Sequence, residues 1–103
     1  MVKELTIKEF NEFIKKGLVL IDFHAHWCMP CVIMSPIVDE ISKKFRDKLK
    51  VGKVNIDENN ELAQKYNIRS IPNFIIFKDG KIANQFVGSI PKEELEKKIK
   101  KFL

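Results

Sequence analysis

The sequence has no long apolar run. Its longest uninterrupted apolar segments, such as Leu18–Ile21, have four residues, whereas a helix that crosses a bilayer needs about 20. The N-terminus alternates charged with apolar residues, so no signal peptide is expected either. Proline and glycine number four each, and the chain contains no repeat, linker or low-complexity segment. These absences predict one soluble domain over residues 1–103, located in the cytoplasm and without a membrane partner.

Cysteine is also scarce. The chain has two, Cys28 and Cys31, and two residues separate them. Proteins inside the cell normally keep their thiols reduced, so this spacing indicates a reactive or metal-binding pair rather than a structural disulfide. The pair by itself favours redox chemistry, but zinc sites use the same spacing, so the neighbouring residues have to decide between them.

The net charge of +5 is not concentrated in one segment. The 19 basic residues are spread from Lys3 to Lys101 and are interleaved with glutamates such as Glu93 and Glu94. A nucleic-acid-binding protein gathers its basic residues in one stripe or patch. The scattered charge therefore predicts a solvated surface and no nucleic-acid partner.

The N-terminal part of the chain predicts a helix and then a strand. Thr6 and Glu9 match a capping box, so a first helix should begin near Ile7 and end before Gly17. The segment Leu18–Phe23 is apolar, rich in β-favouring residues and too short for a helix. We expect it to be the central strand, buried on both faces.

The middle of the chain predicts a long helix, a strand and a short helix. The long helix should run from about Pro30 to Lys48 and continue through Pro36, because the apolar pattern continues beyond this proline. Lys50–Ile56 alternates well enough for a strand, and Asp57 is a candidate N-cap for the short helix. The positions of the long helix expected to face the sheet recur at intervals of four residues: Ile33, Ile37, Ile41 and Phe45.

The C-terminal part predicts a hairpin. Asn73–Lys78 and Lys81–Val87 are expected to be strands, joined by Asp79 and Gly80, which both tolerate positive φ. Ser89 should then open the last helix, together with Pro91 and before the apolar positions Leu95, Ile99 and Phe102. The order of elements predicts an α/β fold, with a mixed central sheet of four to five strands flanked by four helices.

The cysteines lie at the connection between the central strand and the start of the long helix. The first turn of a helix presents free N–H groups and the positive end of the dipole, so a sulfur there is stabilised as the thiolate. Cys28 would therefore be the nucleophile. Cys31 lies one turn on, at roughly 5 to 6 Å, so it can close a disulfide after attack on a substrate disulfide. Pro30 suits the first turn, where its missing donor costs nothing.

A series of further motifs resembles the thioredoxin family. The motifs span nearly the whole chain, in the order and with the spacing of that family. They are Val19–Phe23, Trp27–Cys31, Lys53–Asp57, Ile68–Phe74, Phe77–Gly80 and Phe86–Gly88. The resemblance implies the thioredoxin fold and a monomeric thiol-disulfide oxidoreductase. Such a protein reduces disulfide-containing protein substrates and is regenerated by a thioredoxin reductase.

The resemblance also implies roles for residues at matching positions. Asp22 corresponds to the buried acid that assists deprotonation of the second cysteine, and Lys53 to its basic neighbour. A carboxyl group in an apolar strand should have a raised pKa unless it is paired, and it can then exchange a proton with a nearby thiol. On the residues alone, an exposed Asp22 and a solvated Lys53 remain the alternative.

A substrate-binding surface around the cysteines is implied as well. Ile71–Pro72 matches the family's cis-proline loop, which offers backbone hydrogen bonds to an extended substrate peptide. For Trp27 and Gly88, a core tryptophan and a simple turn glycine are the alternatives. The residues expected to contact substrate are Trp27, Met29, Pro30, Ile71, Pro72 and Gly88.

Two residues, Met29 and His24, depart from the family pattern. Met29 replaces a glycine between the cysteines, where the intervening residues tune the redox potential and about 30 mV corresponds to about 1.4 kcal/mol. His24 stands in the place of an aromatic residue, and His26 lies two residues before Cys28. A protonated histidine near the thiolate would make the protein more oxidising. An oxidising or isomerising thioredoxin-like protein is therefore the alternative function.

The two histidines and the two cysteines also match a zinc-ligand pattern. All four lie within eight residues, whereas structural zinc sites usually draw their ligands from two separated loops. We expect surface histidines, no metal and no other cofactor. A Cys/His metal-binding module remains a further alternative.

Overall fold

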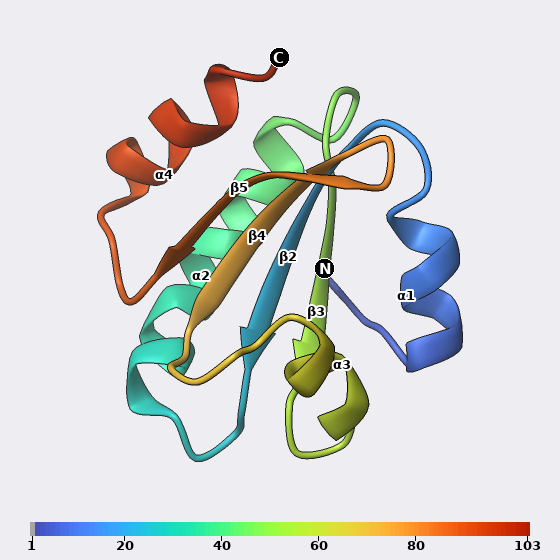
Figure 1. The fold of residues 1–103 in the computed structure, drawn as a ribbon. Helices are drawn as coiled ribbons and strands as arrows, with labels where there is room; N and C mark the ends of the chain where they lie inside the picture. The colour runs from blue at the N-terminus through green and yellow to red at the C-terminus, as the bar shows by residue number, and fades with distance from the viewer. Residues whose placement is uncertain (1) are drawn as a thin grey trace.

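The computed structural model describes residues 2–103, and Met1 lies outside the described residues. The described chain forms a five-stranded mixed sheet in the order β1-β3-β2-β4-β5 (Figure 1). β1 and β2 run parallel to β3, whereas β4 runs antiparallel to β2 and to β5. The strands are β1 (Lys3–Glu4), β2 (Leu18–His24), β3 (Lys50–Asn55), β4 (Asn73–Lys78) and β5 (Lys81–Val87). The helices are α1 (Ile7–Phe13), α2 (Met29–Lys44), α3 (Asn60–Lys65) and α4 (Lys92–Lys100).

Helices cover both faces of the sheet, which confirms the predicted fold class. α2 and α4 pack on one face and α1 and α3 on the other (Figure 1). All seven residues of β2 are buried, as predicted for the central strand. Leu20 belongs to the core cluster under α2 and α4, while Ile21 and Phe23 belong to the cluster on the opposite face. This alternation places Asp22 and His24 on the α2 side of the sheet.

Two local signals are confirmed in detail. The Thr6 hydroxyl accepts a hydrogen bond from the Glu9 backbone N–H at 3.3 Å, and the Glu9 carboxylate accepts one from the Thr6 N–H at 3.0 Å. β4 and β5 are joined by Asp79 and Gly80, whose φ angles are 49° and 84°. The capping box and the hairpin turn therefore form as the sequence predicts.

The buried face of α2 differs from the prediction. The helix continues through Pro36, as expected, but it ends at Lys44 rather than Lys48. Ile33 is 60% exposed, although it was expected to face the sheet. Four residues advance an α-helix by about 400°, so a stripe at intervals of four drifts around the helix and its first member leaves the buried face. The buried residues of α2 are Cys31, Met34, Val38 and Ile41.

Two helix starts were also predicted wrongly. α3 begins at Asn60, with Asn59 rather than Asp57 at the N-cap position. α4 begins directly after Pro91 without a side-chain cap, so Ser89 does not cap it. Before α3 the chain first makes a turn at residues 56–58, and before α4 residues 89–91 lie outside the helix with Pro91 extended. Leu95 and Ile99 of α4 are fully buried as expected, and Phe102 is partly buried against the same cluster.

The short strand β1 was not foreseen as a separate element. Two residues are too few to show a periodic pattern, so β1 is defined only by its pairing with β3. Lys3 pairs with Gly52 and Glu4 pairs with Lys53. Among residues 2–103, no helix is both long and apolar enough to span a membrane.

Candidate active site

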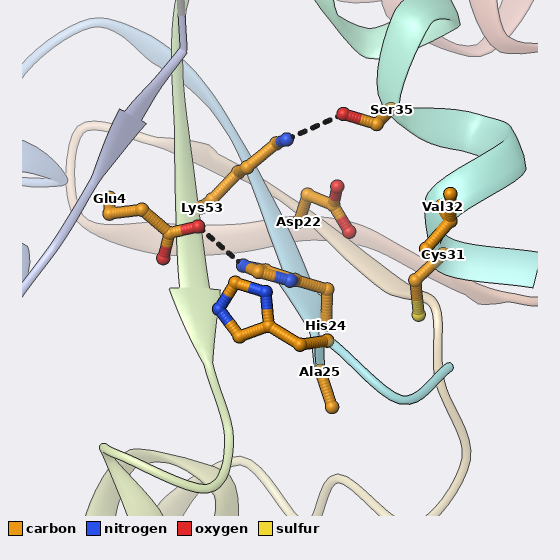
Figure 2. Close-up of a pocket in the computed structure, with 9 residues that line it drawn as sticks. Glu4, Asp22, His24, Ala25, Cys31, Val32, Ser35 and Lys53 are labelled. Atoms are coloured by element: carbon orange, nitrogen blue, oxygen red, sulfur yellow. Dashed lines mark hydrogen bonds and ion pairs between the residues drawn. The ribbon is translucent and has the colours of Figure 1, made fainter. Parts of the chain in front are cut away.

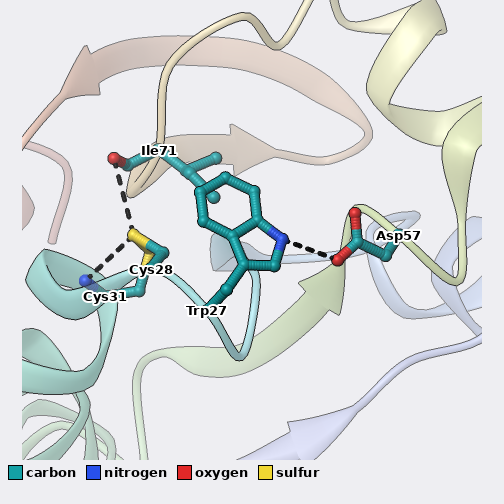
Figure 3. Close-up of a disulfide and its surroundings, with 5 residues drawn as sticks. All are labelled: Trp27, Cys28, Cys31, Asp57 and Ile71. Carbon is teal, nitrogen blue, oxygen red and sulfur yellow. Dashed lines mark hydrogen bonds between the residues drawn. A yellow bond between two sulfur atoms is a disulfide. The ribbon is translucent and has the colours of Figure 1, made fainter.

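Cys28 and Cys31 form a disulfide at the start of α2 (Figure 3). Cys28 is the N-cap residue, and its Sγ accepts a hydrogen bond from the Cys31 backbone N–H at 3.2 Å. The two Cα atoms are 5.3 Å apart, within the range expected for residues one turn apart. A free helix N–H directed at Cys28 Sγ would stabilise the thiolate of the reduced protein. The strand-to-helix position predicted from the sequence is therefore confirmed.

The loop before β4 lies against the disulfide. The Ile71–Pro72 peptide bond is cis, and the Ile71 carbonyl oxygen lies 3.8 Å from Cys28 Sγ. The Gly88 N–H donates a 2.8 Å hydrogen bond to the Pro72 carbonyl, which ties this loop to the end of β5. Three segments far apart in the sequence, at residues 28, 71–72 and 88, thus meet at one end of the sheet.

Trp27 lies at the surface beside the disulfide and is not a core residue. Its side chain is 69% exposed, and its indole N–H donates a 2.8 Å hydrogen bond to the Asp57 carboxylate (Figure 3). Met29 is also exposed, and so are Val32 and Ile33 on the next turn of α2. Val32 and Ile33 were not predicted as site residues. Their signal in the sequence is that they directly follow Cys31 on the helix; the stripe at intervals of four concealed the exposure of Ile33.

Asp22 is buried on the α2 side of the sheet. It is 1% exposed, and its Oδ1 has no hydrogen-bond partner. Burial raises the pKa of Asp22 to about 7, opposed by the positive charge of Lys53 and assisted by the negative charge of Glu4. An exposed Asp22 at a strand end is therefore excluded.

Lys53 lies opposite Asp22 in the register of β2 and β3. Its Nζ does not bond to the carboxylate; it donates a 2.8 Å hydrogen bond to the Ser35 hydroxyl on α2 (Figure 2). Ser35 was missed by the sequence analysis, because only the packing of α2 on the sheet brings it to Lys53. The lysine is thus held beside Asp22, where its charge favours the ionised carboxylate without a direct bond.

Asp22, Lys53, Ser35 and Cys31 line one pocket of about 240 Å³ (Figure 2). The pocket is lined by both polar and apolar groups and lies between the sheet and the first turns of α2. Cys31 is thus on the side of the disulfide that faces the buried acid, whereas Cys28 lies beside the Ile71 carbonyl. The two sulfurs therefore have different neighbours: a buried carboxyl group shares the pocket of Cys31, and a backbone carbonyl lies beside Cys28.

His24 is not the surface residue that the sequence predicted. It is 8% exposed, since it is the last residue of the buried β2, and its Nε2 lies 2.7 Å from the Glu4 Oε2. Burial lowers the pKa of His24, although Glu4 acts in the opposite direction. His26 is exposed as expected. Within residues 2–103, no three side chains of histidine, cysteine, aspartate or glutamate are arranged to hold a metal ion.

A redox-active cysteine pair at a helix N-terminus, beside a cis-proline loop and a buried acid, defines a thiol-disulfide oxidoreductase. Residues 1–101 match the family model described as Thioredoxin. The chain is 39% identical to thioredoxin from Bacillus subtilis, over 99% of this chain and 98% of that protein. It is 49% identical to thioredoxin 1 from Synechococcus elongatus, over 99% of this chain and 94% of that protein. The chain therefore belongs to the thioredoxin family.

Membership of this family and the Cys28–Cys31 disulfide together establish the chemistry. The protein is a protein-disulfide oxidoreductase that works by dithiol-disulfide exchange. The oxidising or isomerising function and the metal-binding module, which the sequence left open, are not favoured by these findings.

Proposed function

We propose that Cys28 is the nucleophile and Cys31 the resolving cysteine of a general protein-disulfide reductase. The observation that carries this assignment is that the Cys31 N–H donates to Cys28 Sγ while Cys31 itself lines the pocket of Asp22. Both sulfurs belong to buried residues, so exposure does not separate their roles. The helix N-terminus favours the Cys28 thiolate, and the nearby carboxyl group can take the proton of Cys31.

The reaction takes place in two exchanges. The Cys28 thiolate attacks one sulfur of the substrate disulfide, so that a Cys28–substrate disulfide forms and the other substrate sulfur leaves as a thiolate. Cys31 then gives its proton to the ionised Asp22 and attacks Cys28 Sγ. The second substrate thiolate leaves, and the Cys28–Cys31 disulfide remains. Two electrons have passed from the protein dithiol to the substrate.

Lys53 supports this proton transfer through its charge. Without a neighbouring cation, the buried carboxyl group would keep its proton to still higher pH and could not accept another. Ser35 holds the Lys53 ammonium at 2.8 Å and so keeps it within the pocket. In this account Asp22 is the proton acceptor, and the charge of Lys53 keeps the pKa of Asp22 low enough for the carboxyl group to be ionised when it is needed.

The substrate-binding surface is proposed to surround Cys28. Trp27, Met29 and Pro30 are exposed, and they would contact the substrate on one side of the sulfur. Ile71 and Pro72 would contact an extended substrate strand on the other side. Gly88 leaves open space at the edge of this surface, because no atom lies within 4 Å of where its Cβ would be.

A reducing rather than an oxidising protein is supported by the state of His24. Burial lowers the pKa of His24, so the imidazole is neutral at neutral pH and does not stabilise a thiolate as a cation would. We further propose that the protein works as a monomer in the cytoplasm and that a thioredoxin reductase returns it to the dithiol form.

Turnover of a model protein disulfide, with dithiothreitol as electron donor, tests this assignment. Wild-type protein should accelerate the reduction, whereas Cys28→Ser should give only the rate of dithiothreitol alone. Equilibration with a glutathione buffer provides the second measurement. The account expects the reduced glutathione pool to leave most of the protein oxidised. A protein that is instead fully reduced at the same buffer ratio would be an oxidant, and the reductase assignment would be wrong.

A further inference from the structure

The pocket beside Cys31 contains titratable side chains that the reaction does not use, and two of them, Glu4 and His24, are in contact. Glu4 comes from β1 and His24 from the end of β2, and both line the pocket with Asp22 (Figure 2). The Nε2 atom of His24 lies 2.7 Å from Glu4 Oε2. The Glu4 side chain is half-exposed and that of His24 is largely buried, so the pair reaches from solvent to the interior.

The strand register aligns Glu4 with the groups of the active site. Glu4 pairs with Lys53 across β1 and β3, and Lys53 pairs with Asp22 across β3 and β2. The three side chains therefore form a row on one face of the sheet, in the order acid, base, acid. Neighbouring strands are about 4.8 Å apart, which places the backbone of Glu4 about 10 Å from that of Asp22. At such a distance a charge on Glu4 acts on Asp22 only partly screened by solvent.

His24 lies in close contact with the Glu4 carboxylate of this row. Its Nε2 is 2.7 Å from Glu4 Oε2 but has no hydrogen-bond partner of good geometry. A carboxylate cannot donate a hydrogen bond, so a hydrogen bond at this contact requires the proton on Nε2 of a neutral imidazole. Burial keeps His24 neutral at neutral pH by lowering its pKa. The histidine thus orients a negative charge towards the pocket without cancelling it.

We infer that Glu4 and His24 are positioning residues that set the pH at which Asp22 changes its protonation state. The charge of Glu4 favours the protonated carboxyl group, whereas that of Lys53 favours the ionised one. The consequence for Cys31 rests on the proposed role of Asp22 as its proton acceptor. The other groups that face Asp22 across the pocket are Cys31 and Ser35 from α2 and His26 from the loop after β2.

The direct test is a carbon NMR titration of the Asp22 carboxyl group in the oxidised protein, in which neither cysteine titrates. In Glu4→Gln the midpoint of Asp22 should fall by about half a pH unit to one unit relative to wild type. Glu12→Gln is the matched control. Glu12 is an exposed glutamate in a surface ion pair with Lys15 on the opposite face, so its loss should leave the midpoint of Asp22 unchanged.

Variants of His24 separate positioning from a general effect on structure. His24→Gln retains a neutral hydrogen-bond donor for Glu4 and should keep the Asp22 midpoint close to the wild-type value. His24→Leu removes the donor, frees the Glu4 carboxylate to move into solvent and should lower the midpoint in the direction of Glu4→Gln. An unchanged Asp22 midpoint in folded Glu4→Gln would overturn the inference.

The rate of the resolving step, measured against pH in wild type and Glu4→Gln, distinguishes this inference from the proposed function. A shift of the rate profile that matches the shift of the Asp22 midpoint supports both. If the Asp22 midpoint moves and the rate profile does not, Glu4 still tunes Asp22, and the role of Asp22 as proton acceptor for Cys31 is wrong.

Discussion

Lys53 lies directly opposite Asp22 in the parallel pairing of β2 and β3, yet its ammonium donates to the Ser35 hydroxyl rather than to the carboxylate. The Asp22 Oδ1 is consequently buried without a hydrogen-bond partner. A direct ion pair with Lys53 would strongly favour the ionised form of Asp22. A nearby cation that is not bonded to the carboxylate only reduces the free-energy cost of burying the ionised form. This arrangement leaves Asp22 able to change its protonation near neutral pH.

The first prediction concerns stability against pH. The pKa of Asp22 is raised from 3.8 to about 7 in the folded protein. The stability contributed by the protonated acid is therefore fully present below the unfolded value and is lost as the pH rises through about 7. In Asp22→Asn this loss is absent. The free energy of unfolding of the variant, relative to wild type, should increase by about 4 kcal/mol between pH 4 and pH 8.

Urea unfolding of both oxidised proteins at the two pH values measures this difference. Subtracting the unfolding free energy of wild type from that of the variant at the same pH cancels the titration of all other groups, because these groups are common to the two proteins. A constant difference between variant and wild type from pH 4 to pH 8 would show that Asp22 is not buried as a neutral acid.

The second prediction concerns the resolving step. In the proposed mechanism Cys31 gives its proton to an ionised Asp22, so its attack on a preformed Cys28–substrate disulfide should quicken about tenfold from pH 6 to pH 8. Asp22→Asn should slow this step about a hundredfold at pH 7 and remove the inflection near pH 7. The rate of this step can be measured by stopped-flow fluorescence, as the release of a fluorescent substrate thiol. An unchanged profile in Asp22→Asn would assign the proton to another acceptor.

A third prediction separates binding from folding at Trp27. The side chain is exposed and its hydrogen bond to Asp57 lies at the surface, so Trp27→Ala should change the free energy of unfolding by no more than about 1 kcal/mol. The same variant should raise the KM for a protein disulfide severalfold, while the rate with a small aromatic disulfide stays within about twofold. Equal losses with both substrates would contradict a role in binding protein substrates.

A fourth prediction concerns the packing of β3 against α1. A Cβ atom added at Gly52 would lie 2.6 Å from Leu5 Cδ1 and 3.2 Å from Phe13 Cε2. Leu5 is itself buried and has little room to move. Gly52→Ala should therefore lower the free energy of unfolding by about 1 to 3 kcal/mol, as measured by urea denaturation. The double variant Gly52→Ala with Leu5→Ala should recover part of this penalty, and full additivity of the two losses would count against the steric explanation.

Much of this fold was predictable because its signals are local. The capping box of Thr6 and Glu9, the buried run of β2 and the turn at Asp79 and Gly80 each depend on residues close in sequence. The cysteine pair was recognisable for the same reason. The stripe of α2 was misplaced at Ile33, since a fixed interval of four does not match the helical repeat.

The remaining site residues depend on contacts that no local pattern encodes. Ser35 meets Lys53 only because α2 lies over β3, and His24 is buried as part of the central strand β2, in contact with Glu4. The strand of Glu4 exists only through its pairing with β3. These features follow from register and packing, which are properties of the whole sheet.

The most direct test of the account is to trap the first covalent intermediate. Cys31→Ser, reduced and mixed with a protein disulfide, should accumulate a stable adduct that mass spectrometry of peptides locates at Cys28. Cys28→Ser should form no adduct under the same conditions. An adduct at Cys31 in Cys28→Ser, with none in Cys31→Ser, would reverse the roles of the two cysteines and contradict the proposed mechanism.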